Sequence, residues 1–147
     1  MKDQKYNILK DFDDCLMRIE DIIGDKTTTN TQLLKLGKQL FGDRFKGVYC
    51  SDQNFRLKNN DCCIINTDSS KQSGTHWCGI YRYKDHHYIF DSFARDYHTL
   101  SRYFKYRHWT NVEFRRIESY KASSCGQLSL TFLLIFDKYK TKCISVI

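Results

Sequence analysis

The segment from Leu128 to Phe136 is apolar on nearly every side of the helix that it would form. A helix of this kind is buried, because it has no polar face to leave in water. In a chain of 147 residues it can be buried only beneath other helices or a sheet. The sequence therefore predicts a single domain, residues 1–147, built around a central helix near its C-terminal end.

The remaining segments supply the layers that would cover this helix. Residues 3–23 and 32–40 have apolar positions at helical spacing, with a glycine close after each stretch. We expect N-terminal helices within residues 3–40 and the core of the domain in about 41–147. Strand-like segments lie at residues 47–49, 62–66, 77–83, 87–90 and 112–117, and residues 97–106 have helical spacing. This order predicts an α+β domain with a mostly antiparallel sheet.

The cysteine content and the net charge indicate the compartment and the partners to expect for this domain. The seven cysteines are odd in number, no Cys-x-x-Cys occurs, and residues 1–20 lack the apolar stretch of a secretory signal. We therefore expect a reducing environment inside a cell. No apolar run approaches the length of about 18 residues that crosses a membrane, so we expect no membrane partner. The net charge of +7 favours contact with polyanions.

Three short motifs, far apart in the sequence, carry complementary side chains. His76 lies in Gly-Thr-His-Trp, Asp91 follows an apolar strand in Ile-Phe-Asp-Ser-Phe, and Cys125 lies in Ser-Ser-Cys-Gly before the central helix. An imidazole, a carboxylate and a thiol are the parts of a cysteine hydrolase. Each residue alone is more often structural, as a strand-end histidine, a turn aspartate or a core cysteine. Their order and their contexts favour catalysis.

Simple geometry indicates how the three side chains would meet. If the strands at 77–83 and 87–90 form a hairpin, His76 lies within about two residues of the position opposite Asp91. Cys125 would begin the central helix, where the helix dipole and unpaired backbone N–H groups stabilise a thiolate. Its own amide is a natural oxyanion donor, and the following Gly126 allows a substrate to approach closely.

These motifs resemble those of the adenovirus-type cysteine endopeptidases, whose active-site layout is similar to that of the proteases of ubiquitin-like modifiers. The resemblance runs from about residue 41 to 136 and rests on His-Trp at 76–77, Asp-Ser-Phe at 91–93 and Cys-Gly at 125–126. It implies a cysteine-protease fold in which the central helix carries the cysteine at its N-terminus. It also implies a source among large DNA viruses, virophages or polinton-like elements.

The same resemblance assigns roles to individual residues. His76 is implied as the general base, Asp91 as the group that orients it, and Cys125 as the attacking thiolate of an acyl-enzyme mechanism. Trp77 and Gly126 are implied to shape the site, although Trp77 fits equally well as a core aromatic.

One position departs from the pattern of this family. The family has a glutamine six or seven residues before the cysteine, and its amide donates to the oxyanion; Ser119 and Glu118 stand here instead. An ionised carboxylate only accepts hydrogen bonds, so Glu118 could donate only when protonated. Otherwise the amide of Cys125 works with another donor. The loss of one donor typically costs about 2.7–4 kcal/mol of transition-state stabilisation.

The function that the resemblance implies is cleavage of viral capsid precursor proteins during virion maturation. It would take place in the virion and in the cytoplasm or nucleus of the infected host cell. We expect a monomer with no obligatory cofactor, and the resemblance permits viral DNA or a short viral peptide as an activator. The candidate nucleic-acid contacts are basic residues interleaved with aromatic ones: Arg82, Lys84, Arg102, Lys105 and Arg107. Their alternative role is to cover apolar surface with their aliphatic stems.

Two other functions are compatible with the sequence. One is an isopeptidase that acts on ubiquitin or SUMO-type modifiers. The other, from a different class, is a basic nucleic-acid-binding module without enzymatic activity, in which Cys125 is structural. We expect no metal site at Cys62, Cys63, His86 and His87, because adjacent strand residues point to opposite faces of a sheet.

Overall fold

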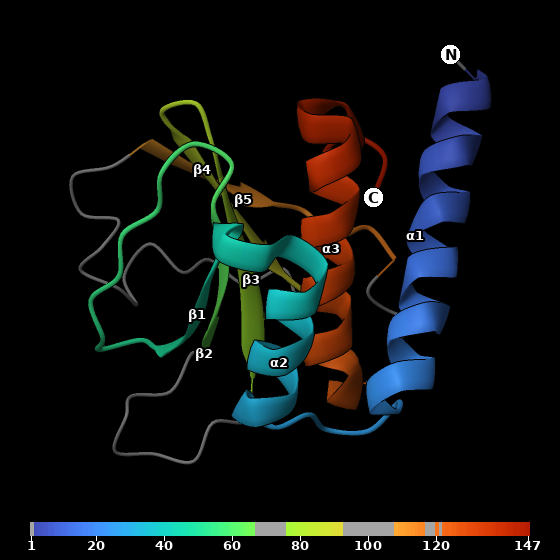
Figure 1. Ribbon diagram of the computed structural model, residues 1–147. Helices are drawn as coiled ribbons and strands as arrows, with labels where there is room; N and C mark the ends of the chain where they lie inside the picture. Colours follow the sequence, from blue (N-terminus) through green and yellow to red (C-terminus); the bar gives the residue numbers. More distant parts are fainter. Residues whose placement is uncertain (1, 67–75, 93–107, 117–119, 121) are drawn as a thin grey trace.

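The computed structural model describes residues 2–66, 76–92, 108–116, 120 and 122–147 (Figure 1). Within them the elements follow as α1 (Lys2–Ile23), α2 (Asn30–Phe41), β1 (Phe45–Cys50), β2 (Cys62–Asn66), β3 (Trp77–Tyr83), β4 (His86–Asp91), β5 (His108–Val112) and α3 (Cys125–Tyr139). Short 3-10 turns lie at Gly42–Arg44, Ala122–Ser124 and Lys140–Cys143. The predicted α+β class is confirmed.

The helix α3 is the central element, with the sheet on one side and α1 on the other (Figure 1). Every residue from Cys125 to Leu133 is buried, which confirms the helix predicted from the apolar run. On the sheet side, Phe132 stacks on Phe90 of β4 with ring centroids 4.9 Å apart. Gly79 of β3 permits this close packing, since a Cβ there would lie 3.1 Å from the carbonyl oxygen of Ser129.

The sheet is mixed, and the prediction of a mostly antiparallel sheet is wrong. Its strand order is β1-β2-β3-β4-β5; the two inner pairings are antiparallel, and the two outer pairings, β1 with β2 and β4 with β5, are parallel. The tight turn at residues 84–85 forces β3 and β4 to be antiparallel. A strand parallel to its predecessor begins at the same end of the sheet, and the sequence intervals between β1 and β2 and between β4 and β5 are long enough to allow this.

The last predicted strand is displaced. A strand was expected at residues 112–117, whereas β5 ends at Val112 and pairs with β4 through residues 108–112. Val112 and Phe114 are both buried, so their alternation imitates a longer strand. Beyond Val112 the chain leaves the sheet, and the backbone N–H of Arg115 donates to the carbonyl of Ile147. The helix predicted at 97–106 lies outside the described residues.

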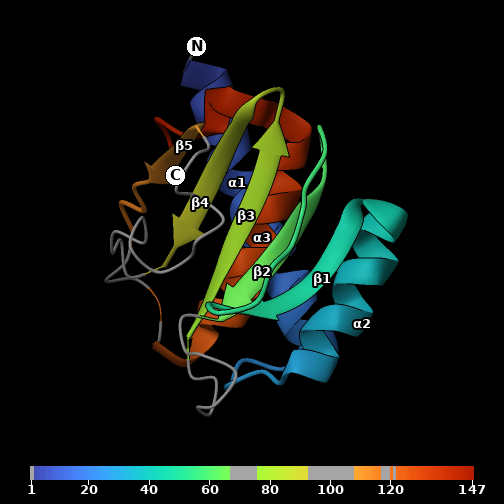
Figure 2. The ribbon, with the colours of Figure 1, turned by 90° about the vertical axis from the view of Figure 1, so that its left-hand side faces the viewer.

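The sheet face turned away from α3 carries a second, smaller apolar cluster. Figure 2 looks onto this face, with α1 and α3 behind the strands and α2 beside β1. The buried members of the cluster are Leu57, Cys63, Ile65, Cys78, Ile80 and Ile89. Leu57 comes from the connection between β1 and β2, which therefore covers part of this face. The central strands are consequently buried on both sides.

Candidate active site

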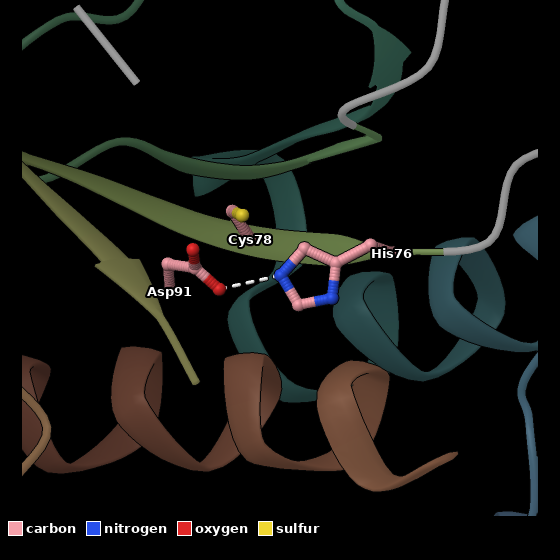
Figure 3. Close-up of side chains that lie close together, drawn as sticks. All are labelled: His76, Cys78 and Asp91. Atoms are coloured by element: carbon pink, nitrogen blue, oxygen red, sulfur yellow. Dashed lines mark hydrogen bonds and ion pairs between the residues drawn. The ribbon is translucent and has the colours of Figure 1, made fainter. Parts of the chain in front are cut away.

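The hairpin of β3 and β4 brings the first two predicted site residues together. It turns at residues 84–85, and its antiparallel register sets Cys78 opposite Asp91. His76 directly precedes β3 at the same end of the hairpin. In Figure 3 the imidazole of His76 and the carboxylate of Asp91 point toward one another, and the atoms His76 Nε2 and Asp91 Oδ1 are 2.5 Å apart.

The thiol of Cys125 approaches this pair from the helix layer. Cys125 is the first residue of α3 and is almost fully buried, with 2% of its surface exposed. Its sulfur accepts a hydrogen bond from the backbone N–H of Trp77, at 3.4 Å, and Cys125 lies close enough to His76 to raise the pKa of that imidazole. The start of the central helix therefore abuts the start of β3, where His76 and Trp77 lie.

A serine one turn into α3 holds these two elements in register. The Ser129 hydroxyl lies 2.7 Å from the carbonyl oxygen of Cys125 and 3.2 Å from that of Trp77. The second contact joins the start of the second turn of α3 to the first residue of β3. Ser129 is fully buried, so solvent does not compete for these contacts.

The surroundings of His76 favour its protonated form. Burial alone lowers the pKa of this imidazole, but the hydrogen bond to Asp91 and the proximity and charges of Asp91 and Cys125 outweigh burial. The net result is a pKa of His76 raised above its ordinary value of about 6.5. An imidazolium between a carboxylate and a sulfur is the arrangement that stabilises a thiolate.

The connection between α1 and α2 forms a wall beside the thiol, which the sequence analysis did not anticipate. Gln127 Nε2 donates to the carbonyls of Gly24 and Lys26, at 2.8 and 2.7 Å. The indole Nε1 of Trp77 donates to the carbonyl of Thr28 at 3.4 Å. Residues 24–28 are thereby held against the first turn of α3, and Gln127, two residues after the cysteine, was the available signal.

A pocket of about 450 Å³ opens between this wall and the sheet. It is lined by Trp77 and Asn66 of the sheet, by Cys50 at the end of β1, and by residues 27–30 of the wall. Trp77 lines the pocket, and its backbone N–H donates to the sulfur of Cys125, so this one residue links the pocket to the candidate nucleophile. A peptide segment bound next to the thiol would find both apolar and hydroxyl-bearing surface there.

Of the two other residues predicted for the site, the structure describes Gly126 and does not describe Glu118. Gly126 is buried, and a Cβ at this position would lie 2.1 Å from the Thr28 hydroxyl oxygen, so the lack of a side chain permits the wall to pack here. Glu118 lies outside the described residues. The structure brings His76, Asp91 and Cys125 together, and their catalytic roles remain predictions.

The candidate nucleic-acid contacts are only partly described. Arg82 is half-buried, and its guanidinium donates to the backbone carbonyls of Leu57 and Lys84. Lys84 is exposed, with its ammonium 5.2 Å from the centroid of the Tyr83 ring. Arg102, Lys105 and Arg107 lie outside the described residues.

One cluster of metal-ligating side chains occurs among the described residues, and it is not the one weighed from the sequence. Ligand atoms of His76, Cys78 and Asp91 all lie within 4.8 Å of one another (Figure 3). Cys62 and Cys63 instead pack into the two different apolar clusters, on opposite sides of the sheet. Cys78 was not predicted as a metal ligand, although the predicted hairpin register already set it beside Asp91.

No protein-family model and no curated protein matches this chain. Among the described helices, none combines the length and the apolar character required to cross a membrane.

Proposed function

We propose that this protein is a cysteine endopeptidase with Cys125 as nucleophile, His76 as general base and Asp91 as the residue that orients the base. The observation that carries the proposal is the convergence of the three side chains, with His76 hydrogen-bonded to Asp91 and close enough to Cys125 for its pKa to be raised by it. They come from three separate elements and are all nearly buried. The position of the thiol at the start of a buried helix adds support, because backbone N–H groups and the helix dipole stabilise negative charge there.

The mechanism follows from which imidazole nitrogen faces which group. Since Nε2 faces Asp91, Nδ1 is the nitrogen that takes the proton from the thiol of Cys125. The thiolate attacks the carbonyl carbon of the substrate, and the carbonyl electron pair moves onto oxygen. The backbone N–H of Cys125 donates to this oxyanion.

Collapse of the tetrahedral intermediate completes the acylation. The oxyanion electron pair re-forms the carbonyl, the peptide C–N bond breaks, and Nδ1 of His76 gives its proton to the departing amine. Water then attacks the thioester while His76 takes a proton from it. The carboxylic acid leaves, and the thiol is restored.

We propose that the protein is related to the adenovirus-type cysteine endopeptidases and that its substrates are viral capsid precursors. The order His76, Asp91, Cys125 along the chain supports it, as does a central helix that begins at the cysteine. We propose viral DNA or a short peptide as an activator; the net charge of +7 supports the DNA. Exposed Lys84 is one candidate contact for DNA.

The direct test is incubation of the protein, beside its Cys125→Ala variant, with a capsid precursor. We expect cleavage by the unchanged protein and none by the variant. Selective alkylation is a second readout, in which Cys125 is labelled fastest and its labelling parallels the loss of activity. Cys15→Ala is the matched control, because Cys15 is half-exposed on α1 and should leave cleavage unchanged. Cleavage that survives Cys125→Ala would exclude the assigned nucleophile.

A further inference from the structure

The cluster of His76, Cys78 and Asp91 has a chemistry beyond that of a catalytic pair. From the juxtaposition of these three side chains at the open end of the β3–β4 hairpin, we infer a binding site for a divalent cation of the zinc type. Occupation of this site would switch the protease off. The binding itself stands independently of the proposed function, whereas its inhibitory effect rests on it.

The backbone places the three ligand atoms on one spot. Cys78 lies opposite Asp91 in the antiparallel pairing, and residues paired in this way project to the same side of a sheet. His76 comes two residues before Cys78 and turns its imidazole to Asp91. All three ligand atoms lie within 4.8 Å of one another, and the exposed fractions are 5% for His76, 0% for Cys78 and 2% for Asp91.

The donor set selects the cation. An imidazole nitrogen, a thiolate sulfur and a carboxylate oxygen are the ligands of protein zinc sites, whereas Mg²⁺ and Ca²⁺ take oxygen ligands. Charge favours the same class of ion, because the carboxylate and the thiolate together neutralise a divalent cation. A neutral complex is the form that a buried site accommodates at least cost. Three protein ligands leave the fourth position of a tetrahedral zinc ion to water.

A small opening of the His76–Asp91 pair is required. Nitrogen and oxygen ligands lie about 2.0–2.2 Å from zinc, so two of them on a tetrahedral ion are roughly 3.3 Å apart. The present separation is 2.5 Å. Side-chain rotation of Asp91, the last residue of β4, can supply the difference without moving the paired strands.

Metal binding disables the base through a shift of its proton. The cation takes the Nε2 lone pair, so the single proton of the neutral imidazole moves to Nδ1, the nitrogen assigned above to accept the proton of Cys125. The proton of the Cys78 thiol is released to solvent. His76 then has no lone pair with which to accept the proton of the nucleophile, and Asp91 no longer orients it.

The test of binding uses Co²⁺, a spectroscopic substitute for zinc, added to the Cys125→Ala protein. We expect saturation at one equivalent, with a thiolate-to-cobalt charge-transfer absorption. In this background Cys78→Ser should abolish that absorption and raise the Kd at least about tenfold. Cys63→Ser is the matched control: it removes another fully buried cysteine of the same apolar cluster and should leave both signals unchanged. Asp91→Asn, which keeps the size of the side chain, should also raise the Kd.

The outcomes separate the inference from the proposed function. Equal cobalt spectra and Kd values for the parent and Cys78→Ser, or no charge-transfer absorption in the parent, would overturn the metal site. In the activity arm, zinc should inhibit the wild-type protein and a chelator should restore it. Cys78→Ser, scaled to its own metal-free rate, should need at least about tenfold more zinc. Equal inhibition of the wild type and of Cys78→Ser by zinc would overturn the inhibitory role of the metal site. A wild-type protein without hydrolytic activity would overturn the proposed function, and the cobalt titration would then still decide whether the metal site exists.

Discussion

Gly126→Ala is the most direct test of the wall that packs against the nucleophile. A Cβ at this position would lie 2.1 Å from the Thr28 hydroxyl oxygen and 3.2 Å from Leu33 Cδ2. Two effects then oppose one another. Alanine is favoured over glycine within a helix by up to about 1 kcal/mol, whereas overpacking a tightly packed site costs about 1–3 kcal/mol. Thr28 is buried and β-branched, so its side chain has little freedom to move away, and we expect overpacking to prevail.

The expected net loss is about 1–2 kcal/mol in the free energy of unfolding, measured by urea titration. The double variant with Thr28→Ala should recover most of it, because the clashing hydroxyl is then gone. Thr28→Ala alone should cost no more than about 1 kcal/mol, since this hydroxyl has no hydrogen-bond partner among the described residues and a methyl group is the main loss. The coupling energy between Gly126 and Thr28 should therefore be about 1–2 kcal/mol.

A functional readout accompanies the stability measurement. If Gly126→Ala displaces the first turn of α3, kcat/KM should fall by up to about a hundredfold and recover in the double variant. Both rates must be measured where the proteins are fully folded. A Gly126→Ala protein as stable as the wild type, or a coupling energy below about 0.5 kcal/mol, would refute the close approach of the wall to the helix.

Three further predictions concern charged and hydroxyl groups. Asp91→Asn removes a group that raises the pKa of His76, so the alkaline limb of the kcat/KM profile should shift to lower pH; an unmoved limb would contradict the contact. Asp137→Asn weakens a contact with Arg44, whose paired hydrogen bonds are 2.6 and 3.1 Å long, and should destabilise the fold by about 1.5–3 kcal/mol in urea titrations. Burial raises the pKa of Asp137, but its hydrogen bonds to Arg44 and Tyr81 outweigh burial, and the net pKa is lowered from its ordinary value. The stabilisation of the fold by this carboxylate should therefore be full above about pH 4, and it should be lost as the pH falls through the lowered pKa. Ser129→Ala should cost about 1–2 kcal/mol, measured in the same way, because it leaves the carbonyl of Trp77 without this donor.

The local patterns in the sequence were sufficient for most of the helices and strands. Helix α3 followed from its unbroken apolar run, and the β3–β4 hairpin followed from two strand-like segments around a two-residue turn. The bounds of β2 and β3 agree with the prediction, because burial on both faces gives a short, continuous apolar run. The start of α2 was placed two residues late because Thr29 caps the helix through Gln32.

Strand direction at the sheet edges depended on how the long connections return, and no short-range pattern records that path. β5 was misplaced because Val112 and Phe114 are both buried, but by different parts of the fold. Val112 lies in the sheet, whereas Phe114 packs against α1, where the centroids of its ring and the Phe12 ring are 5.7 Å apart. Periodicity reports that a residue is buried, and it does not report what buries it.

By itself, the sequence determined which reactive groups are present and the local elements that carry them: an imidazole before one strand, a carboxylate ending the next, and a thiol before an apolar helix. Tertiary structure alone decided that the thiol of Cys125 comes close to His76 and that the α1–α2 connection packs beside it. The reason is physical. Turn chemistry and burial periodicity act over a few residues and are written locally, whereas contacts between distant segments depend on how whole layers pack against one another.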